Sequence, residues 1–115
     1  MTEITDDYMQ AQLAKARVYT IVLLSRGPNY KADGDRSVIW EHGRRNFELR
    51  AAGKLAIVSP MGFGDGTSDI VGLSIFVTSV DETKAIMDAD PAIIAGWLVT
   101  EIRQGRSFPG DGLPA

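Results

Sequence analysis

The sequence predicts an α+β fold in which one antiparallel sheet carries two helices on one face. Two observations lead to this class. The 115-residue chain has four β-type and two helical segments in the order βαββαβ, with no internal repeat of solenoid length. Its composition, with 44% hydrophobic and 23% charged residues, is typical of one soluble globular domain. The ferredoxin-like arrangement satisfies this order of elements.

The first predicted strand follows a polar start. Residues 1–15 form a polar lead-in that includes a short helical pattern, "DDYMQAQLAKA". The stretch "RVYTIVLL" (17–24) is rich in β-branched and aromatic residues, which predicts a strand. The next stretch, "SRGPNYKADGD" (25–35), contains Gly, Pro, Asn and Asp and is therefore interpreted as a loop.

A helix and a second strand are predicted in the centre of the chain. The helix covers 38–52, with Ser37 as its N-cap and Gly53 as its C-terminal stop. The stretch "KLAIVSPM" (54–61) is the second strand. The motif "GFGDG" that follows is interpreted as part of a hairpin loop over 62–69. A phosphate-binding loop would lead into a helix, whereas a strand comes next here.

The last third of the chain contains two further strands and a helix. The stretch "IVGLSIFVTS" (70–79) is the third strand. Ser79 and Glu82 have the spacing of a capping box, which starts the second helix. This helix should end about Asp90, because the next residue is proline. The stretch "GWLVTEIRQ" (96–104) is the fourth strand.

The hydrophobic pattern of the strands predicts how the domain assembles. The domain is expected to span 16–105, followed by a Gly/Pro-rich tail over 106–115 without regular structure. Strands 17–24 and 70–79 are apolar at odd and even positions alike, whereas a sheet with one face in water alternates. Two helices cover only one face. We therefore expect a second copy of the chain on the other face, as a homodimer through facing sheets.

The central helix carries the only histidine of the chain, His42. It is either a partly solvated side chain without a role or the one group suited to proton transfer near neutral pH. On a helical wheel it lies away from the stripe expected to pack on the sheet. That stripe consists of Trp40, Gly43, Phe47 and Ala51. Charged pairs at i,i+4 spacing are interpreted as a solvated face without function, namely Glu41–Arg45 and Arg44–Glu48.

Composition argues against several kinds of partner. With one histidine and no cysteine, we expect no metal site and no disulfide. The net charge of −3 disfavours a nucleic-acid partner. No apolar run approaches the ~20 residues that span a bilayer, and the acidic N-terminal segment is unlike a secretory signal. We therefore expect a cytoplasmic protein without a membrane partner.

Two segments, "EHGRRNFELRAAGKLAIVSPM" and "VTSVDETKAIMDADPAIIAGW", resemble the YCII-related family of the dimeric α/β-barrel superfamily. The resemblance rests on the position of the histidine, the glycine-led second strand and the Asp-Pro motif. It implies a ferredoxin-like fold that dimerises sheet to sheet. It also implies a site formed by His42 and Asp90, with Asp88 as the fallback partner. The Gly-Pro of the family is Ser59-Pro60 here.

The same resemblance implies a cofactor-free small-molecule enzyme, of the lyase, isomerase or dehalogenase-like kind. In this reading His42 moves a proton and Asp90 orients the imidazole. The expected substrate contacts are Ser25, Arg26 and Ser59, of which Arg26 is suited to an anionic group. The alternative is a non-catalytic, small-ligand-binding dimeric module, because the same cleft and basic side chain serve both functions.

Overall fold

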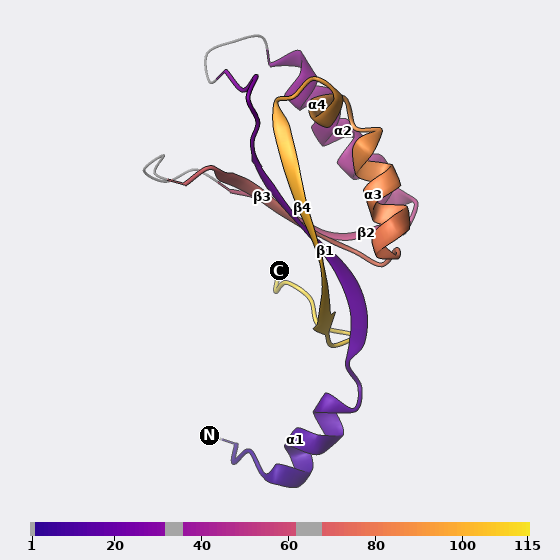
Figure 1. Ribbon diagram of the computed structural model, residues 1–115. Coiled ribbons are helices and arrows are strands. Elements are labelled where there is room, and N and C mark those ends of the chain that lie inside the picture. The colour runs from indigo at the N-terminus through magenta and orange to yellow at the C-terminus, as the bar shows by residue number, and fades with distance from the viewer. Residues whose placement is uncertain (1, 32–35, 62–67) are drawn as a thin grey trace.

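The computed structural model describes residues 2–31, 36–61 and 68–115 (Figure 1). The predicted hairpin loop after the second strand therefore lies mostly outside the described residues. The elements of the described part, in chain order, are α1 (Asp6–Leu13), β1 (Arg17–Arg26), α2 (Ser37–Ala51), β2 (Leu55–Pro60), β3 (Ile70–Phe76), α3 (Val80–Asp88), α4 (Pro91–Ile94) and β4 (Leu98–Ser107).

The strands form one sheet of order β2-β3-β1-β4, in which every neighbouring pair is antiparallel. Helices α2, α3 and α4 lie together on one face of this sheet (Figure 1). The connection from β1 through α2 to β2 leaves room for β3 between the two strands. This is the ferredoxin-like βαββαβ topology, so the predicted fold class is confirmed.

The core lies between the sheet and the helices. Alternate residues of β1 and β3 turn toward the helices, because successive side chains of a strand point to opposite faces. Phe76 and Val22 are completely buried there, and Met87 of α3 packs on them. The buried hydrophobic residues are Val22, Leu24, Leu55, Phe76, Met87, Ala92 and Leu98.

The first half of the chain differs from the prediction at two boundaries. Strand β1 does not stop before Ser25 but continues to Arg26, because Ser25 pairs with Val99 and Arg26 with Leu98 of β4. Helix α2 already includes Ser37, so the predicted N-cap is wrong by one residue. The predicted helix stop is confirmed, since Gly53 has φ +75°, a left-handed conformation that favours glycine.

The segment between β3 and β4 contains one helix more than predicted. Ser79 caps α3 as expected, since its hydroxyl accepts a hydrogen bond from the Glu82 N–H. Helix α3 ends at Asp88, before the proline, as predicted. The proline then starts the short α4, because Pro is well suited to the first turn of a helix. Strand β4 consequently begins at Leu98, later than predicted, and continues to Ser107. The prediction of an irregular tail from residue 106 is therefore wrong for its first two residues, which pair with β1.

The face of α2 that packs on the sheet is not the predicted one. Trp40 and Phe47, expected to be core residues, are 71% and 62% exposed. His42 and Asn46 are the buried residues of this helix. Helix α2 is therefore turned so that a polar pair faces inward and an aromatic pair faces out. The hydrogen bonds described below compensate the burial of that polar pair.

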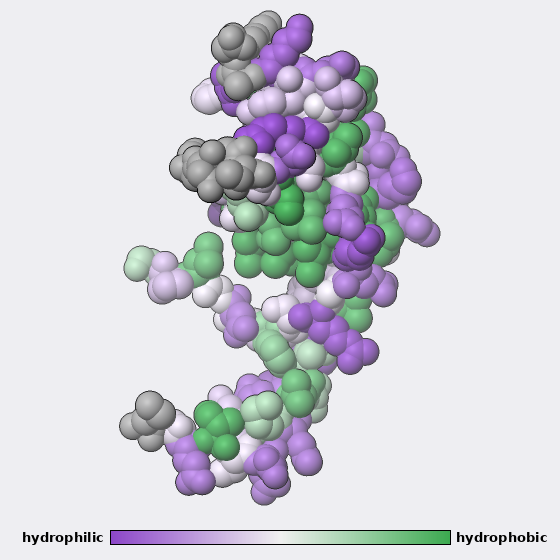
Figure 2. Space-filling view, turned by 60° about the vertical axis from the view of Figure 1, so that its left-hand side comes forward, coloured by the Kyte–Doolittle hydropathy of each residue, from purple (hydrophilic) through white to green (hydrophobic). Residues whose placement is uncertain are grey.

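The sheet face opposite the helices is apolar, as the strand pattern predicts. Ile21 pairs with Ile75 and Leu23 with Leu73 on this face, and all four are only partly buried. Figure 2 turns this side of the molecule forward and shows hydrophobic side chains gathered over the middle of the sheet. No helix of the described chain covers them.

Helix α1 stands apart from the body of the molecule, next to the N-terminal end of β1 (Figure 1). None of its residues is buried, although the Thr5 hydroxyl caps it by accepting from the Tyr8 N–H. The radius of gyration, 16.6 Å, accordingly exceeds the roughly 13 Å typical of a compact domain of about this length. Within the described residues, none of the helices has the length and apolar character needed to cross a bilayer.

Candidate active site

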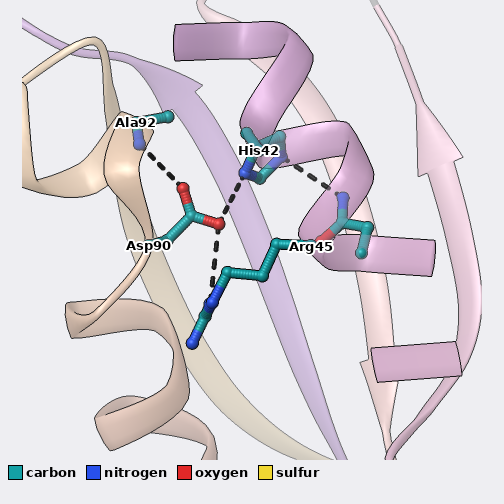
Figure 3. A network of polar contacts seen from close by, with 5 residues as sticks. His42, Arg45, Asp90 and Ala92 are labelled. Carbon is teal, nitrogen blue, oxygen red and sulfur yellow. Dashed lines mark hydrogen bonds and ion pairs between the residues drawn. The ribbon is translucent and has the colours of Figure 1, made fainter. Parts of the chain in front are cut away.

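His42 and Asp90 form the centre of the candidate site (Figure 3). His42 lies on the inward face of α2, with 9% of its surface exposed. Its Nδ1 atom is 2.8 Å from Oδ2 of Asp90, which is 1% exposed. The two residues that the sequence singled out are therefore in direct contact.

The conformation around Asp90 fixes the direction of its carboxylate. Asp90 precedes a proline and has an extended backbone, which makes it the N-cap of α4. Its Oδ1 accepts a hydrogen bond from the Ala92 N–H at 2.8 Å, which leaves Oδ2 for His42. The fallback partner Asp88 lies elsewhere. Its exposed carboxylate accepts a hydrogen bond from Lys84 at 2.6 Å.

Arg45 is a third member of the cluster that sequence reasoning missed. Its Nη1 lies 3.6 Å from Oδ2 of Asp90, the same oxygen that contacts His42. Within the described residues this Nη1 is buried without a hydrogen-bond partner. The i,i+4 spacing of Glu41 and Arg45 predicted a solvated ion pair between them, but Glu41 pairs with Arg44 at 3.2 Å. Because α2 is turned away from the predicted orientation, Arg45 points toward Asp90.

The charge state of Asp90 follows from these contacts. Burial raises the pKa of this carboxyl, because it disfavours the charged form. The hydrogen bond and charge of His42, the Ala92 N–H and the charge of Arg45 all act in the opposite sense and outweigh it. The net effect is a lowered pKa, so Asp90 is an ionised carboxylate near neutral pH.

The second nitrogen of His42 contacts Asn46, one turn further along α2. Nδ2 of Asn46 is 3.3 Å from Nε2 of His42. An ionised carboxylate only accepts hydrogen bonds, so Nδ1 of His42 must donate to Asp90. In the neutral imidazole Nε2 then carries the lone pair, and the Asn46 amide is its donor. The basic nitrogen of the site is thus held in place by Asn46.

A cavity of about 500 Å³ lies between α2 and the sheet and reaches this cluster. Its wall includes His42 and Asn46, together with two of the three expected substrate contacts, Arg26 and Ser59. The third, Ser25, is not part of this wall. A larger hollow of about 1090 Å³ covers the outer side of α2. It does not include His42, so the smaller cavity is the candidate active site.

Tyr30 lies at the end of this cavity, in a position set by a close backbone approach. A side chain on Gly27 would collide with the carbonyl oxygen of Gly96, so only glycine brings this segment so near to the turn before β4. The ring of Tyr30 packs edge-on against Trp97, with centroids 5.5 Å apart. The Arg26 guanidinium lies 5.3 Å from the centroid of the Tyr30 ring.

Two arginines act on the hydroxyl of Tyr30. The pKa of Tyr30 is lowered, chiefly because Arg26 donates a hydrogen bond to the phenol oxygen. Burial opposes this effect, and a hydrogen bond from Arg36 adds to it. Sequence reasoning had placed Arg26 at a site but not Tyr30 or Arg36. The only available signal was their position in the Gly- and Pro-containing segment before α2.

Comparison with known proteins gives structural likenesses only. The sequence matches no protein-family model and no curated protein. A 5-chloro-2-hydroxyhydroquinone dehydrochlorinase from Burkholderia phenoliruptrix, in complex with 2,5-dihydroxybenzoquinone, is similar at 21% identity with a TM-score of 0.48. That match covers 74% of this chain and 90% of the other. The methylated protein RPA0582 is similar at 17% identity with a TM-score of 0.32, over 95% and 96% of the two chains. The fold assignment itself rests on the topology of the sheet.

Proposed function

We propose that this chain is a cofactor-free enzyme that moves a proton on a small-molecule substrate, with His42 as the general base and acid. The observation that carries the proposal is the buried hydrogen bond between Nδ1 of His42 and Asp90, beside a cavity large enough for a small molecule. A histidine oriented by a carboxylate through Nδ1 presents Nε2 as the reacting atom.

The proposed reaction begins when a substrate enters the cavity and replaces the Asn46 amide at Nε2. His42 then takes a proton from an acidic C–H or O–H group of the substrate. The imidazolium that forms is stabilised by Asp90, whose second oxygen stays fixed by the Ala92 N–H. Return of the proton to another atom of the substrate gives an isomerisation. Departure of a leaving group with the electron pair of its bond gives an elimination, after which the imidazolium gives its proton to the leaving group or to solvent.

A specific observation favours the alternative of a non-catalytic ligand-binding module. The lone pair of Nε2 is already used by Asn46, at 3.3 Å. If the Asn46 amide stays in place when a ligand binds, His42 has a structural role, and the cavity binds its ligand without turnover. The two functions therefore differ in whether Asn46 leaves Nε2.

The proposal includes a homodimer through the open face of the sheet. The apolar pairs Ile21–Ile75 and Leu23–Leu73 lie on that face. A second copy related by a two-fold axis would bury them against the same residues, as an isologous interface requires. In such a dimer the helices and the His42 cavity of each copy lie on the outside.

The test is proton exchange with solvent. A panel of enolisable ketones and hydroxylated aromatic acids, with 5-chloro-2-hydroxyhydroquinone added, is incubated with the protein in D₂O. Deuterium uptake and chloride release are followed by mass spectrometry and ion chromatography. The wild type should accelerate exchange or chloride loss on at least one compound. The His42→Gln variant should reduce that rate by about 10²–10⁴-fold, the usual contribution of general acid–base catalysis.

Asp88→Asn serves as the matched control, because Asp88 is an exposed carboxylate two residues from Asp90. It should react like the wild type. If compounds bind in the cavity but none of them reacts faster with the wild type than with His42→Gln, the binding module is the correct reading.

A further inference from the structure

The wall of the His42 cavity is positively charged. Three arginines belong to it, namely Arg26, Arg36 and Arg50, and they come from the end of β1 and from both ends of α2. Within the described residues, no aspartate or glutamate is part of the wall. A cavity lined by one sign of charge concentrates ligands of the opposite sign.

Two carboxylates of the described residues, Asp90 and Asp69, lie near this cavity. Asp90 lies behind His42, where His42, Arg45 and the Ala92 N–H already contact it. Asp69 lies 3.9 Å from Arg26, but its side chain is 89% exposed, so solvent weakens that pair. The positive charge of the wall is therefore not compensated by these two groups.

Arg26 is the best placed of the three arginines. Its side chain is 25% exposed, and its Nη1 is fixed by a hydrogen bond to the carbonyl oxygen of Ser68 at 2.6 Å. Its guanidinium also stacks on Tyr30, whose own ring packs against Trp97. A planar guanidinium that is held from two sides is preorganised to bind an anionic oxygen, because little side-chain freedom is lost.

The remaining wall of the cavity is largely apolar. Leu24, Val58 and Leu98 belong to the sheet side of the cavity, and Ile39 belongs to its α2 side. Apolar surroundings of this kind do not stabilise an inorganic anion, whereas they favour an organic anion whose apolar body is buried against them. His42 belongs to the α2 side of the same cavity, close to where that body would lie.

We propose that the substrate of this site is a small organic anion, whose carboxylate or other oxyanion binds at Arg26, Tyr30 and Arg36 while its apolar body lies beside His42. That the bound anion is a substrate rests on the proposed function, whereas its contacts with the arginines concern binding alone. Arg36, the N-cap of α2, lies six residues before His42, roughly 9 Å along the helix at 1.5 Å per residue. That separation suits a ligand about the size of one substituted ring.

The experiment compares two probes of the same shape and different charge, benzoate and benzamide. Both are titrated into the protein, and the ring signals of His42, the only histidine, report occupancy by proton NMR. Benzoate should shift these signals and saturate, with an affinity at least about 10-fold higher than that of benzamide. A charge-assisted hydrogen bond of ordinary strength accounts for such a factor.

Variants locate the anionic group. Arg26→Gln should reduce benzoate affinity by about 10-fold and leave benzamide unchanged. Arg26→Lys should retain part of the preference, because it keeps the charge but not the planar fork. Arg44→Gln removes an exposed arginine from the outer side of α2 and is the matched control. It should bind both probes like the wild type. Circular dichroism checks that each variant is folded.

Two outcomes overturn the inference: equal affinity of the wild type for both probes, or unchanged benzoate affinity in Arg26→Gln. Anion binding can be tested separately from the proposed catalysis, because Asp90→Asn removes the His42–Asp90 pair but not the arginines. If benzoate is preferred in Asp90→Asn and in a wild type that has no detectable turnover, the anion site stands and the enzymatic proposal fails. If turnover is found but benzoate is not preferred over benzamide, the enzymatic proposal stands and the anion site fails.

Discussion

Nδ1 of His42 donates a hydrogen bond to Oδ2 of Asp90 over 2.8 Å, although 48 residues separate them in the chain. The contact depends on two local features. Helix α2 turns His42 toward the sheet, and Pro91 keeps Asp90 extended so that its carboxylate faces α2. One buried carboxylate thereby caps α4 and orients the only imidazole of the chain.

Asp90→Asn should change the tautomer of His42. Asparagine still caps α4, but the atom facing Nδ1 can be an amide donor instead of a carboxylate acceptor. At alkaline pH, where an imidazole is neutral, nitrogen NMR should show the Nδ1–H tautomer in the wild type. In the variant the population should move toward the Nε2–H form. An unchanged tautomer in Asp90→Asn would show that Asp90 does not orient the ring.

The stability of the fold should depend on pH through Asp90. Its pKa is lowered by folding, so its contribution is present above the unfolded value of about 3.9 and is lost as the pH falls through the folded value. At neutral pH, Asp90→Asn should reduce the free energy of unfolding by about 1–3 kcal/mol, because a buried charged acceptor is removed. Below the folded pKa the two proteins should have nearly the same stability.

Urea denaturation from pH 7 downward measures this difference. Asp88→Asn is the control, since an exposed i,i+4 pair with Lys84 contributes about 0.5 kcal/mol or less. A wild-type advantage over Asp90→Asn that stays constant on acidification would contradict the assignment of Asp90 as the ionised partner.

Much of the fold followed from the sequence because the decisive signals are local. The strand patterns, the Ser79 cap and the Gly53 stop each depend on a few neighbouring residues, and each matches an element boundary to within a few positions. The additional helix α4 was missed because it has only four residues, too few for a periodic pattern. The continuation of β1 through Arg26 was missed because it depends on pairing with β4, a distant segment.

The site was predictable only in part. His42 stood out as the only histidine, whereas its pairing with Asp90 was named through a family resemblance. Arg45 and Asn46 were not, because their roles depend on the rotation of α2 about its axis. A helical wheel ranks faces by apolarity and therefore chose the side of Trp40. A polar face that is satisfied by hydrogen bonds from another element has no signature in one sequence.

Because Trp40 lies on the outer side of α2, its truncation to alanine should destabilise the fold much less than truncation of a core residue. Trp40→Ala should change the free energy of unfolding by no more than about 0.5 kcal/mol, because the side chain is 71% exposed. Phe76→Ala should cost about 3–5 kcal/mol, since Phe76 is completely buried in the core. Denaturant unfolding monitored by circular dichroism compares the two. A cost for Trp40→Ala close to that for Phe76→Ala would mean that another surface covers α2.

The open face of the sheet should hold two copies of the chain together. Leu23 pairs with Leu73 near the middle of that face, and both remain partly exposed in the single chain. Leu23→Glu would place a charge from each copy inside the proposed interface, where burial of unpaired charges is unfavourable. Sedimentation equilibrium at micromolar concentration should give a dimer for the wild type and a monomer for Leu23→Glu.

Trp40→Glu adds the same charge on the helical side and should leave the dimer intact. A wild type that sediments as a monomer with native-like circular dichroism would rule out the sheet-to-sheet assembly. A monomeric Trp40→Glu would instead move the interface to α2.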